Sequence, residues 1–408
     1  MQKLVKENTH MQAIVVTFDR LATRLIGCYG NEWIETPNLD RLASGATVFD
    51  NHFADSVGQS AGQAWFTGRS SSSPPLPVSD NLISLLHQAG IATELRIASR
   101  SQLCGSESLN FDRVVQTVGD DGLDVDPNAV PIARLVQSSV SLLNEPTPAT
   151  NRLVWLHAPE PGLPPEGFAT LYFEDFEERG MSMTEIPREN WSQEIAVAAG
   201  SVSLVDHWIG ELLSQINVLS QQQPTLLIIT AARGRSYLEG FLAESPTARG
   251  ATPADLLREQ EVKSPLLLSI QGGGEPFADF NSIRCPHFVQ ATDLAPTLLD
   301  WFGLTKPSGF EGTSLLKEAL SVQSTRKQVR FRDDCRNLGL RTTEWNCLVR
   351  LAEENGSITK GVCFGDATWP ERVQLFSKPD DIWDVTDLAT QQPEVCESLV
   401  RELASSIG

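Results

Sequence analysis

The sequence of 408 residues is 41% hydrophobic and 21% charged, which is typical of a soluble globular protein with a full hydrophobic core. Its formal net charge of −20, from 52 acidic against 32 basic residues, argues against nucleic acid or anionic lipid as a partner, since both would be repelled over most of the surface. Because no run approaches the roughly 20 apolar residues that span a bilayer, and none precedes the first predicted strand, we expect a cytoplasmic protein without membrane contact.

Strand and helix signals alternate along the first three quarters of the chain. A run of β-branched and apolar residues at 13–18 predicts a strand that is covered on both faces. Helices are predicted at 37–43, 80–89, 131–144 and 192–216, and further strands at 91–98, 153–156, 225–230 and 265–270. This alternation requires crossover connections, so it predicts an α/β fold with a doubly wound, mostly parallel sheet.

The last quarter of the chain has a different pattern. A helix at 293–301 is followed by a loop at 306–312 that is rich in Pro and Gly, as at a domain boundary. We therefore predict an α/β domain over 1–318 and a small C-terminal α+β domain over 319–408. The second domain has predicted antiparallel strands at 328–332, 338–350 and 372–376, and a closing amphipathic helix at 391–406.

Five short motifs follow one another along nearly the whole chain. The two most specific are Thr36–Ala43, which reads Thr-Pro-Asn-Leu-Asp-Arg-Leu-Ala, and Asp293–Asp300. Weaker ones are Thr67–Arg69, Val205–Gly210 and the pair Leu375-Phe376. In this order they resemble the sulfatase family, and the resemblance implies an alkaline-phosphatase-like fold. Most of these motifs serve packing and turns, so they indicate the fold rather than an activity.

The resemblance also locates the position of the nucleophile. Family members carry a Cys or Ser there, converted to formylglycine, nine residues before the Thr of Thr-Gly-Arg. Counting back from Thr67 gives Gly58, which has no side chain to oxidise or to attack with. The turn proline and the activating arginine of the family motif are replaced as well. Ser60 is either a substitute nucleophile or a structural serine.

The two loops that would hold the family's divalent cation are also altered. The family places an Asp pair after the first strand, and an Asp with Asn or His after the strand at 225–230. Here these positions read Asp19-Arg20 and Ala232-Arg233-Gly234. Calcium needs about six oxygen ligands, several of them from carboxylates, and one Asp beside two arginines does not supply them. We predict no metal and no other cofactor, with Asp19 as the residual family position.

Other catalytic groups of the family have no counterpart in this sequence. No lysine lies between Lys6 and Lys263, although family members grip the sulfate with lysines. The family's second histidine corresponds to Glu160. His157 remains, either as a structural hydrogen-bonding residue or as a general acid.

Two interpretations of the arginines follow from the position of their loops. Loops at the carboxyl ends of neighbouring parallel strands converge on one crevice. Arg20 and Arg233 can replace the charge of the cation, so that with Asp19 they bind sulfate, phosphate or a carboxylate, since guanidinium holds such anions bidentately. Alternatively, Arg20 pairs with Asp19 or another acid and only plugs the vacated site.

Three functions are compatible with this sequence. The first is a non-catalytic sulfatase-like protein that binds a small anion or a protein partner, such as an active relative. The second is an active hydrolase of sulfuric or phosphoric esters with a non-standard nucleophile. The third is a structural subunit in which the old crevice has no role. We favour the first, because losing the nucleophile, the metal and the lysines that grip the sulfate removes every main contribution to catalysis at once.

Overall fold

The computed structural model describes most of the chain, with several internal gaps. The described residues are 10–99, 101, 103, 109–143, 151–172, 191–221, 223–236, 257–272, 280, 282–324, 326–334, 336–351 and 372–404. No helix among them is long and apolar enough to cross a membrane.

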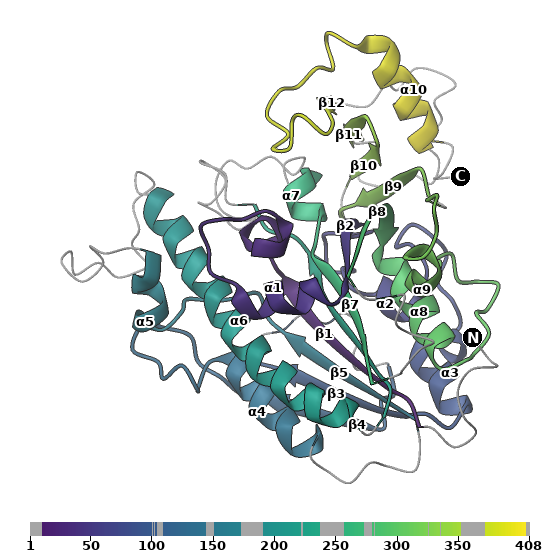
Figure 1. Cartoon of the computed structure of the whole chain (residues 1–408). Coiled ribbons are helices and arrows are strands. Elements are labelled where there is room, and N and C mark those ends of the chain that lie inside the picture. The colour runs from purple at the N-terminus through teal and green to yellow at the C-terminus, as the bar shows by residue number, and fades with distance from the viewer. Residues whose placement is uncertain are drawn as a thin grey trace.

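A sheet of eight strands runs through the centre of the larger part of the molecule (Figure 1). In spatial order its strands are β4 (Arg113–Thr117), β3 (Ala92–Ala98), β5 (Arg152–Ala158), β1 (Gln12–Arg20), β6 (Thr225–Arg233), β7 (Leu266–Gln271), β2 (Thr47–Phe53) and β8 (Ile283–Gln290). All neighbours pair in parallel except β7, which is antiparallel to both β6 and β2. The expected mostly parallel sheet is thereby confirmed.

Helices cover both faces of this sheet, and β1 shows why. Its residues Ala13 and Val15 belong to one hydrophobic cluster and Ile14 and Val16 to another, because successive side chains of a strand point to opposite faces. The first cluster packs against α2 (Ala64–Thr67), α3 (Leu82–Gln88), α8 (Leu294–Trp301) and α9 (Leu315–Glu318). The second packs against α1 (Pro37–Ser44), α4 (Pro131–Leu143), α5 (Glu166–Ala169) and α6 (Trp191–Ser220). The fold is therefore doubly wound, as its sequence pattern indicates.

Three strands of this sheet were not expected from the sequence. They are β2, β4 and β8, whose burial patterns are mixed or exposed rather than continuously apolar. In β4, the edge strand next to β3, Val114 is 56% exposed. A strand at the sheet edge is buried on fewer sides, so its hydrophobic signal is weak.

A second, antiparallel sheet of four strands lies toward the C-terminus (Figure 1). Its order is β12 (Arg372–Ser377), β11 (Trp345–Arg350), β10 (Asn337–Thr342) and β9 (Gln328–Arg332). The helix α10 (Pro393–Ala404) packs its apolar face on this sheet, where Leu399 and Leu403 meet Leu340 and Leu375. The small C-terminal α+β unit is confirmed, while its exact boundary at residue 318 stays a prediction.

A buried cluster of charges joins this unit to the large sheet. Glu259, which begins α7 (Glu259–Val262), pairs with Lys378 at 2.8 Å and with Arg341 at 3.0 Å. Lys378 also pairs with Asp384 at 2.8 Å, and its side chain is only 1% exposed. Burial by itself raises the pKa of the Glu259 carboxyl, but Arg341, Lys378 and Lys263 outweigh it and hold that pKa at about 2. The ammonium of Lys378 is the cation that both acids share.

We expect Lys378→Met to lower the free energy of unfolding by about 3–5 kcal/mol, because it leaves two buried carboxylates without their shared cation. Urea-induced unfolding measures the change. Lys317→Met is the matched control, since Lys317 pairs with Asp300 at 3.5 Å but is 71% exposed. That control is expected to lose at most about 1 kcal/mol. Equal stability of the two variants would refute the role of the cluster.

Candidate ligand site at the carboxyl edge of the sheet

The candidate residues lie at the carboxyl ends of three adjacent parallel strands, β5, β1 and β6. In the register of these strands, Thr17 of β1 lies opposite His157 of β5 and Thr230 of β6. Further along, Arg20 of β1 lies directly opposite Arg233 of β6. Strand pairing thus brings together two arginines that are more than 200 residues apart in the sequence.

A chain of hydrogen bonds begins inside the sheet and ends at Asp19. The indole N–H of Trp155 can only donate, and it donates to Thr17 Oγ1 at 2.9 Å. Thr17 Oγ1 lies 2.8 Å from Nδ1 of His157, and Nε2 of the same ring lies 2.9 Å from Asp19 Oδ1. When Thr17 donates to Nδ1, the ring carries its proton on Nε2 and donates it to the carboxylate. His157 is only 1% exposed and orients Asp19 from within the strand.

Arg20 is neutralised by an acid that follows β5. Its Nε lies 3.6 Å from Glu160 Oε2, and the other oxygen of Glu160 lies 2.9 Å from Nη1 of Arg235. Glu160 therefore serves two arginines at once. No sequence pattern indicated this ion pair of Arg235.

Arg233 is in a different situation. Its Nη1 donates to the carbonyl oxygen of Val57, and within the described part of the chain it forms no ion pair. Burial, followed by the nearby guanidinium of Arg20, lowers the pKa of Arg233 to about 10, although Glu261 and Glu160 act in the opposite direction. These four residues, Arg20, Arg233, Arg235 and Glu160, are here called the arginine cluster. Its positive charge is only partly compensated.

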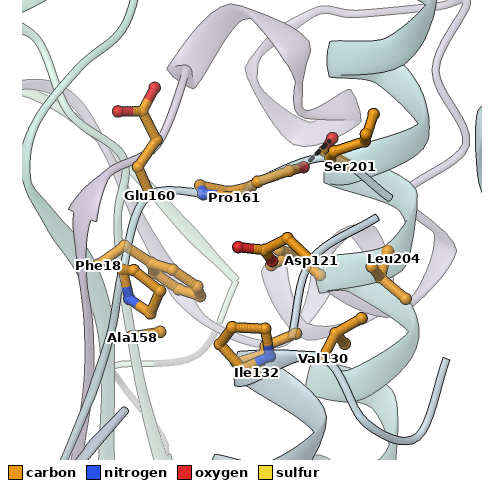
Figure 2. Close-up of a pocket in the computed structure, with 14 residues that line it drawn as sticks. Phe18, Asp121, Val130, Ile132, Ala158, Glu160, Pro161, Ser201 and Leu204 are labelled. Carbon is orange, nitrogen blue, oxygen red and sulfur yellow. Dashed lines mark hydrogen bonds between the residues drawn. The ribbon is translucent and has the colours of Figure 1, made fainter. Parts of the chain in front are cut away.

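A small cavity lies beside Glu160, on the side of the sheet covered by α4 and α6 (Figure 2). Its volume is about 20 Å³, close to that of a single water molecule, and its walls are mostly apolar, with Phe18, Ile132 and Leu204 among them. In Figure 2 the carboxylate of Glu160 points away from this cavity. Glu160 therefore borders the cavity, but its carboxylate is turned toward Arg20 and Arg235.

The segment Ser56–Ser60 lies next to Arg233 and includes Ser60, the candidate substitute nucleophile. Ser56 Oγ lies 2.7 Å from Ser60 Oγ and accepts from the Gly58 N–H at 3.3 Å. Ser60 Oγ donates to Oδ1 of Asp334 at 3.1 Å, and the Gln59 N–H donates to Oδ2 of the same carboxylate. Asp334 lies between β9 and β10, so the C-terminal unit contributes an acid to this segment.

Gly58, which the family resemblance places at the nucleophile position, is in direct contact with this acid. A Cβ atom built on Gly58 would lie 2.1 Å from Cγ of Asp334, far inside van der Waals contact. The backbone of Gly58 does not itself need a glycine, because its φ is not positive. The carboxylate of Asp334 therefore occupies the space that a nucleophilic side chain at position 58 would need.

The candidate metal position has few acidic ligands. Among the described residues, no three His, Cys, Asp or Glu side chains come together in a way that could hold a metal ion. Asp19, the residual family position, already accepts a hydrogen bond from His157, and the opposite position on β6 is Arg233.

Two contacts of this site were missed by sequence reasoning. The acid that pairs with Arg20 is Glu160, which was identified only as the replacement of a histidine. Asp334 was not considered at all, because it is 275 residues from Gln59 and follows a strand of the other sheet. No local pattern distinguishes it from an ordinary turn residue, so no signal in the sequence reveals the contact.

Comparison with known proteins gives consistent results for most of the chain. A family model described as Sulfatase matches residues 12–304. Arylsulfatase K of Mus musculus is 24% identical over 218 residues, which are 50% of this chain and 34% of the mouse protein. The rat protein, Arylsulfatase K of Rattus norvegicus, is 22% identical over 218 residues, or 50% of this chain and 33% of its own length. The match thus spans about a third of the length of these curated relatives.

Solved structures extend the likeness to nearly the whole chain. One, from a study of the metabolism of multiple glycosaminoglycans by Bacteroides thetaiotaomicron, has a TM-score of 0.71 at 14% identity and covers 96% of this chain and 94% of its own. A phosphonate monoester hydrolase of Agrobacterium radiobacter has a TM-score of 0.67 at 16% identity, with 97% and 95% covered. At these identities the likeness establishes the fold alone.

We expect Gly58→Ala to lower the free energy of unfolding by at most about 1 kcal/mol, because the new methyl group displaces an exposed carboxylate that loses two hydrogen bonds but can turn into water. In an Asp334→Gly background the same substitution should cost almost nothing, and a double-mutant cycle in urea measures the difference. Gly167→Ala is the control, since a Cβ there meets no atom within 4 Å. Equal costs of Gly58→Ala in both backgrounds would contradict the close contact.

Proposed function

The chain belongs to the sulfatase family, and we propose that it no longer hydrolyses esters but binds a small oxyanion at the arginine cluster. The observation that carries this proposal is Arg233, a mostly buried guanidinium next to a second arginine and without an ion-pair partner in the described residues. Buried charges are normally paired, so this one favours an anion from outside the chain.

Loss of hydrolysis is supported by the nucleophile position. Glycine cannot attack sulfur or phosphorus, and the Asp334 carboxylate fills the adjoining space. A negative charge at this point also repels the negatively charged ester that a sulfatase must bind. Both effects act against the same catalytic step.

Absence of calcium is a further part of the proposal. The donor set offers one carboxylate, Asp19, which already accepts from His157, together with two arginines at the facing positions. Calcium requires six to eight oxygen ligands, and guanidinium repels any cation. These residues therefore do not fit the family's metal, and we propose that no cofactor takes its place.

The class of ligand follows from the geometry of arginine. A guanidinium presents parallel N–H groups that match two oxygens of a sulfate, phosphate or carboxylate group. Relatives include sulfatases and a phosphonate monoester hydrolase, whose names refer to tetrahedral oxyanions of sulfur and phosphorus. We propose sulfate or phosphate, free or as part of a larger molecule or a protein partner, as the ligand of the arginine cluster. Arg20, which Glu160 already neutralises, only fills the vacated cation site in this proposal.

We expect sodium sulfate or phosphate to raise the melting temperature of the wild-type protein above that in sodium chloride of equal ionic strength. Arg233→Gln should weaken anion binding about tenfold or more, since it removes a charge-assisted contact worth about 1.5–3 kcal/mol. Arg233→Lys should restore only part of it, because lysine lacks the planar fork. Thermal shift and isothermal titration calorimetry provide the two measurements.

The control for this experiment is Arg113→Gln, because Arg113 is 57% exposed on the edge strand β4 and should not affect anion binding. If the wild type does not respond to either anion, or if Arg233→Gln responds as fully as the wild type, the proposal is wrong.

One observation favours a second candidate function, that of an active ester hydrolase. Ser60 Oγ donates to a carboxylate oxygen of Asp334 at 3.1 Å, an arrangement in which a carboxylate can accept the proton of a serine nucleophile. The same serine is also bonded to Ser56 Oγ at 2.7 Å, as a structural serine would be. Only turnover distinguishes the two roles.

We expect no hydrolysis of aryl sulfates or aryl phosphates above the rate of the Ser60→Ala variant, with calcium, manganese or zinc or without any of them. The reason is that the carboxylate of Asp334, which accepts from Ser60, opposes the negative charge that develops in the transition state. Turnover by the wild type that disappears in Ser60→Ala would instead establish the hydrolase and overturn the non-catalytic assignment.

A further inference from the structure

The backbone that surrounds Gly58 has the features of an anion-binding turn. The N–H groups of Gly58 and Gln59 and the hydroxyls of Ser56 and Ser60 all lie within one five-residue segment. Two of these groups, the Gln59 N–H and the Ser60 hydroxyl, converge on one carboxylate, and convergent donors in a turn form a positively polarised surface that binds anions. We refer to Ser56–Ser60 as the 56–60 turn.

The hydrogen bonds of the 56–60 turn have one consistent direction. The Gly58 N–H donates to Ser56 Oγ, the Ser56 hydroxyl can donate to Ser60 Oγ, and the Ser60 hydroxyl donates to Asp334. Each hydroxyl has a single proton, so this arrangement uses every donor once. The carboxylate of Asp334 accepts at the end of the chain and also accepts from the Gln59 N–H. The turn thus already holds an anion that belongs to the protein itself.

The backbone around Asp334 is fixed, whereas its side chain is exposed. The last residue of β9 pairs with the start of the 56–60 turn, where the Arg332 N–H donates to Asp55 O at 3.1 Å and the Val57 N–H donates to Arg332 O at 3.0 Å. Asp333 accepts from the Asn337 N–H at 2.9 Å and so holds the turn after β9. Asp334 is solvent-exposed, so its carboxylate can rotate away without moving the backbone on either side.

We propose that the 56–60 turn is an oxyanion-binding site and that the Asp334 carboxylate is its resident anion, which an external carboxylate, sulfate or phosphate group must displace. This inference deepens the proposed function, on which it rests for the class of ligand. It assigns a second set of donors next to the arginine cluster, because Val57, whose carbonyl accepts from Arg233, directly precedes Gly58. Asp334 then acts as an internal competitor that weakens binding of outside anions.

Chemical rescue tests the proposal. Asp334→Ala empties the 56–60 turn, and the variant should melt about 2 °C below the wild type in sodium chloride. Sodium formate, at the same ionic strength, supplies a free carboxylate and should recover most of this loss, with little effect on the wild type. Asp334→Asn is the second variant, since its amide still fills the space and should prevent rescue by formate.

Glu344→Ala is the matched control, because Glu344 is an exposed acid on the neighbouring β10–β11 hairpin and its removal should produce no response to formate. Calorimetry with sulfate provides the second readout. In it, Asp334→Ala should bind sulfate at least about tenfold more tightly than the wild type, because the competing carboxylate is gone; a tenfold change in affinity corresponds to about 1.4 kcal/mol. If formate stabilises Asp334→Ala no more than it stabilises the wild type and Glu344→Ala, the proposal is overturned.

The failure of this inference can be told apart from the failure of the proposed function. Formate rescue of Asp334→Ala should persist in the Arg233→Gln/Asp334→Ala double variant, because the turn donors do not include arginine. Rescue in both backgrounds, without any sulfate response of the wild type, would support the turn site and refute anion binding by the arginine cluster. A sulfate response that depends on Arg233, without formate rescue, would support anion binding by the arginine cluster and refute the turn site.

Discussion

The parallel pairing of β5, β1 and β6 is the constraint on which the rest of the site depends. Parallel strands in a continuous sheet end at the same edge, and their register fixes which residues face each other. Arg20 and Arg233 are opposite because Thr17 and Thr230 are opposite further inside the sheet. A change of one residue in this register would place one of the two arginines on the opposite face of the sheet.

A second constraint comes from the C-terminal unit. Strand β9 hydrogen-bonds to the segment before Gly58, and this contact carries Asp334 to the 56–60 turn. The buried charges around Lys378 hold the same unit against α7, close to where β6 ends. The small antiparallel sheet therefore does more than extend the fold, because it supplies the acid that lies against Gly58.

The substitutions at the site are physically coupled. A glycine at position 58 leaves room for the Asp334 carboxylate, and that carboxylate would repel an anionic ester. Arginines at the positions that the family resemblance assigns to a cation supply positive charge of their own, but they cannot act as metal ligands, because guanidinium has no free electron pair to offer. Together these changes support the proposal of a site that holds an anion rather than cleaving one.

The sequence by itself determined the fold class and the buried strands β1, β5 and β6, and it supplied the positions at which we propose that catalytic groups are missing. Burial on both faces leaves a local trace, since β1, β5 and β6 are continuous apolar runs, and the alternation of such runs with helices implies a parallel sheet. Edge strands such as β4 left no such trace, because their side chains are exposed. Which acid meets which arginine was decided only by the tertiary structure. Glu160 reaches Arg20 across neighbouring strands, and Asp334 reaches Gln59 across 275 residues, so both contacts depend on strand pairing and side-chain reach rather than on any local pattern.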